Sequence, residues 1–180
     1  MNMKFVLTVI ATLFVMVTAW KVSQDNAPQT EVQRSEFLPE LLASANDVDA
    51  LTIRNSDNET RLERQGENWV ISNKDGYPAK IADIRKTLLQ LARLISVEAK
   101  TSRPEQHGRI GLLTPASGDG AGTLVRASAE DNELVSLIIG NSRNAGSQQQ
   151  HYIRRTAEDQ SWLVAGELES AISIPNAYAA

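Results

Sequence analysis

The chain has 180 residues, with 22 Asp and Glu against 18 Lys and Arg, and it contains no cysteine. The lack of cysteine excludes disulfides, thiolate metal sites, a cysteine nucleophile and the lipid attachment of bacterial lipoproteins. All 22 acidic residues follow residue 22, and setting aside Lys4 and Lys21 leaves 16 basic residues there, a net charge of about −6. Nucleic acid and anionic lipid headgroups are therefore poor partners for that part of the chain.

An uncharged and mostly apolar run extends from Phe5 to Trp20. It fits either a cleavable signal peptide or an uncleaved membrane anchor, and both imply export. Small residues at Val17 and Ala19 suit a signal peptidase, whereas including Val22 brings the run to about 17 residues, the short end of the spanning range. We expect the anchor: residues 1–22 as a single-pass, N-in helix of the bacterial cytoplasmic membrane, with the remainder on the extracytoplasmic or periplasmic side.

The polar stretch at residues 23–35, with Pro28 as its one proline, predicts a flexible tether. Residues 36–180 are then expected to form one extracytoplasmic domain with its own core. Near its start, Leu51 and Ile53 alternate with polar neighbours, Leu62 lies among charged residues, and an apolar run covers 69–71, with turn-forming residues such as Asn55 and Gly66 between these segments. This pattern predicts a three-stranded antiparallel meander with strands at 51–53, around Leu62 and at 69–71.

Apolar residues at steps of three and four predict one main amphipathic helix that opens just after Pro78 and packs on the sheet. The stripe consists of Ile81, Ile84, Leu88, Leu91 and Ile95. Charged residues lie largely off this stripe, as expected for a solvated face.

The second half predicts strands at 124–126, 134–139, 152–154 and 162–164, followed by a short helix at 168–172. Local echoes relate Ile53 and the three residues after it to the segment that starts at Ile139, and Trp69 to Trp162. The predicted fold class is therefore α+β: a membrane helix, then antiparallel meanders packed with the main helix, in two related hairpin-plus-helix units. Chance similarity between short strands is the alternative. Three glycines between the halves, within 114–123, predict a mobile loop.

Four segments together resemble the bacterial family catalogued as domain of unknown function 4340. They are Tyr77-Pro78-Ala79, Gly111-Leu112, Tyr152-Ile153-Arg154-Arg155 and Trp162-Leu163-Val164. The resemblance covers about 37–172 and implies a membrane-anchored extracytoplasmic protein, commonly encoded beside ABC transporters of the gliding-motility type, with no established enzyme activity. Family members are often longer than this chain.

The resemblance and the residues together favour a binding or docking module, an accessory subunit of an ABC-transporter-like assembly. The chain has no Gly-x-x-x-x-Gly-Lys-Ser/Thr phosphate loop, so the permease and ATPase must be other chains. The alternative is a stand-alone envelope hydrolase or ligand sensor. His107, in a polar connection expected to be solvated, and His151, on a strand and expected to face water, are the two available histidine bases, and neither has metal-ligand spacing. We therefore predict no enzyme activity, no cofactor and no metal.

One cluster of cations is the candidate interaction surface. Arg154 and Arg155 follow Tyr152 on a predicted strand, and Arg143 lies in the preceding segment. Together they could form a basic spot on an acidic domain and bind a carboxylate, a phosphate or an acidic loop of a partner. Surface salt bridges to the abundant Asp and Glu are the alternative.

Overall fold

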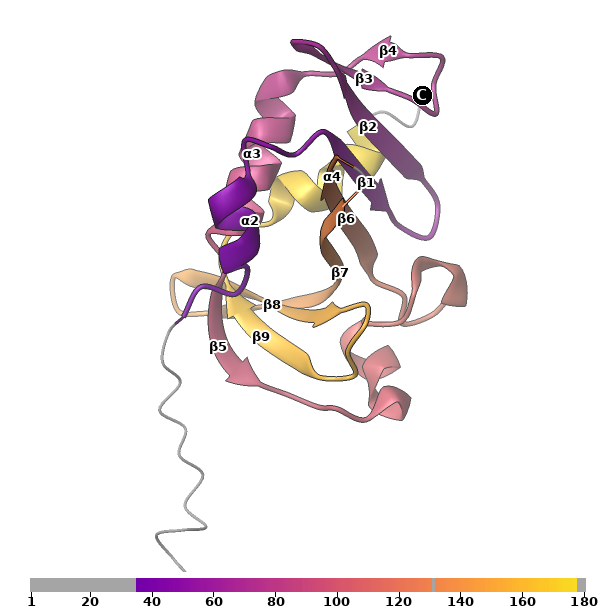
Figure 1. Ribbon diagram of the computed structural model, residues 1–180. Coiled ribbons are helices and arrows are strands. Elements are labelled where there is room, and N and C mark those ends of the chain that lie inside the picture. Colours follow the sequence, from indigo (N-terminus) through magenta and orange to yellow (C-terminus); the bar gives the residue numbers. More distant parts are fainter. Residues whose placement is uncertain (1–34, 131, 178–180) are drawn as a thin grey trace, which may run out of the picture. The chain divides into compact units, whose positions relative to one another are not determined.

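The computed structural model describes residues 35–130 and 132–177. In these residues nine strands form one antiparallel sheet, in the order β4-β3-β2-β1-β6-β7-β8-β9-β5 (Figure 1). The strands are β1 (Ala50–Arg54), β2 (Glu59–Gln65), β3 (Asn68–Ile71), β4 (Tyr77–Pro78), β5 (Ile95–Ala99), β6 (Thr123–Ala129), β7 (Asn132–Ala145), β8 (Gln148–Arg155) and β9 (Ser161–Ala165). The helices are α2 (Pro39–Ser44), α3 (Ile81–Ala92) and α4 (Glu169–Ala177), with the 3₁₀ helices η1 (Pro104–Ile110) and η2 (Pro115–Ser117).

The expected α+β fold of two hairpin-plus-helix units is wrong, because the strands of both halves join in a single sheet with only a few short helices. β1 pairs along its whole length with β6, with Leu51 opposite Ala127 and Ile53 opposite Val125. An exposed strand edge leaves backbone groups unpaired, and this pairing covers two such edges at once. The described part of the chain is therefore a predominantly antiparallel β domain.

The sequence echoes fall on the first and third strands of the consecutive antiparallel meanders β1-β2-β3 and β7-β8-β9. Ile53 lies in β1, beside the junction of the two halves, whereas Ile139 lies in β7, one strand away from that junction. Trp69 lies in β3 and Trp162 in β9. The four-residue echo nevertheless differs in local structure, because Asn55 and Ser56 lie in the turn after β1 whereas Asn141 and Ser142 lie within β7.

The expected transmembrane helix has no counterpart among the described residues. None of the helices between residues 35 and 177, with residue 131 set aside, is long and apolar enough to cross a membrane. The run from Phe5 to Trp20, on which that prediction depended, lies outside the described residues, as does nearly all of the predicted tether.

The local strand predictions of the first half are confirmed. β1, β2 and β3 form the expected meander. The turn between β1 and β2 is closed by Asn55, whose side-chain oxygen accepts hydrogen bonds from the backbone N–H groups of Asp57 at 2.9 Å and Asn58 at 2.7 Å. This is the usual local role of an asparagine in a turn.

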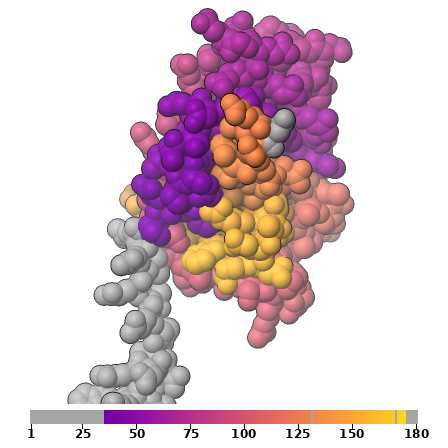
Figure 2. Space-filling view, viewed as in Figure 1, coloured from indigo at the N-terminus to yellow at the C-terminus, as the bar shows by residue number. Residues whose placement is uncertain are grey.

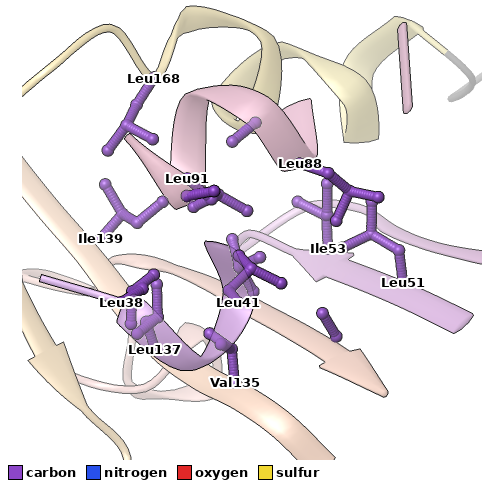
Figure 3. Packing of buried hydrophobic residues seen from close by; sticks show 14 of the residues in the cluster. Leu38, Leu41, Leu51, Ile53, Leu88, Leu91, Val135, Leu137, Ile139 and Leu168 are labelled. Atoms are coloured by element: carbon purple, nitrogen blue, oxygen red, sulfur yellow. The ribbon is translucent and has the colours of Figure 1, made fainter. Parts of the chain in front are cut away.

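The main core lies on one face of the sheet, beneath the helices. Leu51 and Ile53 of β1 face Leu88 of α3, while Leu41 of α2 lies near Val135 and Leu137 of β7 (Figure 3). α4 contacts β1 and β2, and α2 contacts β7, so helices from both ends of the domain cover this face. All of the residues labelled in Figure 3 are buried: Leu88 keeps 6% of its surface, Val135 and Ile139 keep 2% each, and the others keep none.

α3 confirms the predicted amphipathic helix but is shorter than its apolar stripe. It ends at Ala92, and Ile95 instead opens β5, the strand at one edge of the sheet. β-branched residues at Ile95 and Val97 favour an extended chain over another helical turn. The predicted stripe included Ile95 because this residue lies four positions after Leu91. Such a spacing does not show where a helix ends and the next strand begins.

The other face of the sheet is covered in its second half by residues 100–122. Glycines allow the close approach: a Cβ at Gly140 would meet the carbonyl oxygen of Ile110, and one at Gly122 would meet that of Gly111. The backbone N–H of Leu113 donates to Gly120 at 3.1 Å. The segment predicted as a mobile loop is thus hydrogen-bonded to the preceding connection and packs against the sheet.

Candidate functional site

Arg154 and Arg155, the centre of the predicted basic spot, point to opposite faces of β8. Neighbouring side chains of a strand alternate between its two faces. Arg155 lies on the side of α2, where it contacts Phe37 and Glu40, whereas Arg154 lies on the side of Leu112. These two guanidinium groups therefore do not form one patch.

Arg155 joins the start of the domain to its second half. Its Nη1 lies 2.6 Å from Oε1 of Glu40, and its Nη2 donates to the carbonyl oxygen of Phe37 at 3.0 Å. The guanidinium also lies over the Phe37 ring, 5.5 Å from the centroid. Figure 2 shows the indigo residues of this first segment against the orange and yellow residues of the second half. Arg155 is thus a structural residue.

Arg154 closes the turn between β8 and β9. Its Nη1 donates to the carbonyl oxygens of Arg155, Thr156 and Glu158 at 3.3, 3.3 and 3.0 Å. Its Nη2 donates to the carbonyl oxygen of Leu112 at 3.4 Å, which ties the turn to the connection over the sheet. A half-buried guanidinium used in this way has little capacity left for an external carboxylate.

Arg143 and Tyr152 lie on the Arg154 side of the sheet, because Arg143 is opposite Gln150, and Gln150, Tyr152 and Arg154 alternate onto one face of β8. Arg143 is exposed in the outer part of β7 and donates from Nε to Oε1 of Gln150 at 2.9 Å. Tyr152 is half-buried and lines a hollow with Lys100 and Arg109. The structure therefore places Arg143, Tyr152 and Arg154 on one face of the sheet and Arg155 on the other, and a docking role for the four residues stays a prediction.

Both histidines are buried, contrary to the expectation that they face solvent. His107 is 3% exposed, and its Nε2 lies 2.9 Å from the carbonyl oxygen of Asp159. His151 is 1% exposed, and neither ring nitrogen has a hydrogen-bond partner among the described residues. Burial lowers the pKa of His151 from its ordinary value of 6.5. The nearby backbone of Gly166 raises this pKa by a smaller amount, although it does not form a hydrogen bond with the ring. Neither ring is placed to reach a substrate in solvent.

The described residues contain no group of three or more His, Asp or Glu side chains that could hold a metal ion.

A further candidate surface is the solvent side of α3, opposite the core. We define the α3 outer face as Ala82, Arg85, Lys86, Leu89 and Arg93, all of which are exposed. At 3.6 residues per turn they fall within about 100° of arc, centred on Leu89. Leu89 keeps 47% of its surface in solvent, more than Leu42 at 43% and less than Tyr77 at 64%.

Three adjoining hollows follow this helix. The first, of about 500 Å³, lies between Trp69, Ile81 and Arg85. The second, of about 630 Å³, lies between the α3 outer face and Gly166 with Glu167, and it shares Arg85 with the first. The third, of about 370 Å³, continues past Arg93 to the tip of the β7–β8 hairpin. The second and third hollows share Arg93, Gly166 and Glu167 and form one strip, whereas the first lies on the other flank of α3 and meets the second only at Arg85.

The cations of the α3 outer face have no partners within the domain. In the part of the chain that the structure describes, Arg85, Lys86 and Arg93 form no side-chain ion pair or hydrogen bond. Other cations of the sheet are paired, as Arg61 is with Glu59 and Arg155 with Glu40. The sequence contained the signal for this surface, since Lys86, Leu89 and Arg93 follow helical steps, but these charges were interpreted only as a solvated face.

No family model, no curated protein and no solved structure matches this chain. The resemblance to the domain of unknown function 4340 family therefore stays a prediction. The described residues form a domain with one antiparallel β-sheet, and its candidate surface is the cationic α3 outer face.

Proposed function

We propose that this domain is a binding or docking module that acts through the α3 outer face as an accessory subunit of a transporter-like assembly. The observation that supports a binding role is the strip formed by the second and third hollows, which presents an exposed Leu89 among three cations without partners. Exposed apolar surface beside charges without internal partners is typical of protein-binding sites. The class of partner, an ABC permease with its ATPase, comes from the family resemblance.

Binding is a better account of this surface than catalysis. A general base must reach the proton that it removes, yet His107 and His151 are 3% and 1% exposed. The α3 outer face itself offers guanidinium and ammonium groups, which bind anions but are poor bases because they stay protonated near neutral pH.

The proposal is tested by affinity purification of the tagged full-length chain from its native cells in mild detergent, followed by quantitative mass spectrometry. We expect the wild-type chain to recover a permease and an ATPase in fixed proportion. The double substitution Lys86→Glu with Arg93→Glu is expected to reduce that recovery about tenfold.

The matched control carries Arg103→Glu with Arg109→Glu, which reverses two exposed cations outside the α3 outer face. Recovery with this control should match that of the wild-type chain. Equal recovery by both double variants would show that the α3 outer face is not the docking site, and recovery of the chain alone would remove the transporter partner.

A further inference from the structure

The charges along α3 are arranged around an apolar centre. Lys86 and Arg93 lie about one turn before and after Leu89, and Arg85 lies on the same side. The strip from Ala82 to Arg93 is about 16 Å long at 1.5 Å per residue. A cation, an apolar contact and a second cation in a line would match a partner segment that carries carboxylates on either side of an apolar side chain.

The walls of the central hollow show that this side of the domain is cationic. Arg85, Lys86 and Arg93 line it, and Glu167 is the one carboxylate among its lining residues. This excess of positive charge contrasts with the net charge of the chain, −4. A local field of this sign attracts anions and repels other cationic surfaces.

The form of the strip favours a chain segment over a compact ligand. The second and third hollows share Arg93, Gly166 and Glu167 and reach from Ala82 to the tip of the β7–β8 hairpin, so an occupant that fills both must be elongated. An anionic bilayer is a weaker candidate, because the acidic remainder of the domain would be repelled by the same headgroups that the strip attracted.

We infer that the α3 outer face binds an acidic peptide segment of a partner protein, with carboxylates on Lys86, Arg93 and Arg85 and an apolar side chain against Leu89. This inference rests on the proposed docking function and specifies its partner chemistry. Arginine provides paired N–H donors that match a carboxylate, and lysine adds a mobile positive charge.

The test uses fluorescence anisotropy with the full chain and a labelled synthetic peptide of about twelve residues, which spans the strip whether helical or extended. The peptide has Leu at its centre and Glu on both sides, and a matched peptide has Gln in place of every Glu. We expect the Glu peptide to bind about tenfold more tightly than the Gln peptide. Raising NaCl from about 50 to about 500 mM should remove most of this preference.

Variants of the chain locate the contact. Lys86→Glu with Arg93→Glu should weaken binding of the Glu peptide about tenfold, and Leu89→Ala should weaken both peptides about threefold. The control Arg103→Glu with Arg109→Glu should bind the Glu peptide as the wild-type chain does. Circular dichroism of each variant shows whether it is folded, and an unfolded double variant is replaced by Lys86→Gln with Arg93→Gln.

Three results would overturn the inference. These are equal affinity for the Glu and Gln peptides, the absence of binding by either, and binding that the α3 variants leave unchanged. Binding of vesicles with about 30% anionic lipid, lost in the α3 double variant, in the absence of peptide binding would assign the surface to a membrane instead. If the α3 double variant loses the transporter subunits while no peptide binds, the docking function stands and the acidic peptide is wrong.

Discussion

At the scale of single residues, Arg155 shows how a charged side chain on a strand can be fully used inside the fold. It contacts Glu40, the Phe37 carbonyl and the Phe37 ring. The sequence suggested a basic spot because Arg154 and Arg155 are adjacent. Adjacency along a strand separates two side chains onto opposite faces, so the predicted strand itself argued against a single patch.

Arg155→Ala is expected to destabilise the domain by about 1–2 kcal/mol, because it leaves the Glu40 carboxylate and the Phe37 carbonyl without their donors. Urea denaturation followed by circular dichroism measures the free energy of unfolding. Arg143→Ala, which removes one hydrogen bond at an exposed position, should cost less than about 0.5 kcal/mol. Equal losses from the two substitutions would contradict a structural role of Arg155.

His151 is expected to make stability depend on pH. Its pKa is lowered by burial in the folded domain, so below pH 6.5 the unfolded chain binds a proton that the folded one resists. The contribution is fully present above 6.5 and is lost as pH falls from there through the folded pKa. The free energy of unfolding of the wild-type chain should therefore decrease on acidification from pH 7.5 more steeply than that of His151→Gln. If the free energies of unfolding of the two proteins changed with pH in parallel, the pKa of His151 would be the same in the folded and unfolded chains, which would contradict this prediction.

At the scale of elements, α3 divides its residues between two roles. One side packs Ile84, Leu88 and Leu91 into the core, and the other presents the α3 outer face to solvent. The 3.6-residue period was enough to predict the buried side of this helix. It was not enough to predict where the helix ends, because Ile95 continues the spacing into β5.

Two leucines of α3 provide a matched pair. Leu91→Ala, at a position with no exposed surface, should cost about 2–5 kcal/mol because it opens a cavity in the core. Leu89→Ala, at 47% exposure, should cost less than about 1 kcal/mol. Thermal and urea denaturation compare the two. A large loss for Leu89→Ala would show that this side chain supports the fold and would weaken its assignment to a binding surface.

At the scale of the whole molecule, the strands could be predicted and their order could not. Alternation of apolar and polar residues located the segment that became β1, and short apolar runs beside turn residues located those that became β3 and β9. The pairing of β1 with β6, and the placement of β5 beside β9, join residues far apart in the chain. Hydrophobic periodicity carries no information on such partners, so one nine-stranded sheet was mistaken for separate meanders.

The candidate surface shows the same limit. The cations of α3 were visible in the sequence, but their lack of partners and the hollows beside them depend on what the rest of the chain places nearby. Arg154 and Arg155 were expected to be free to bind a partner, because the sequence does not show which residues accept their hydrogen bonds. Those acceptors, at Leu112, Phe37 and Glu40, are remote in sequence.

The central claim, that the α3 outer face is the docking site, is tested most directly by lysine footprinting of the complex recovered from native cells. An amine-reactive acetylating reagent modifies the exposed Lys86 in the isolated chain. We predict that acetylation of Lys86 slows about tenfold in the complex, whereas that of Lys100, which is paired with Glu98 beside a different hollow, does not change. Unchanged acetylation of Lys86 in a complex that contains the partner would contradict the claim.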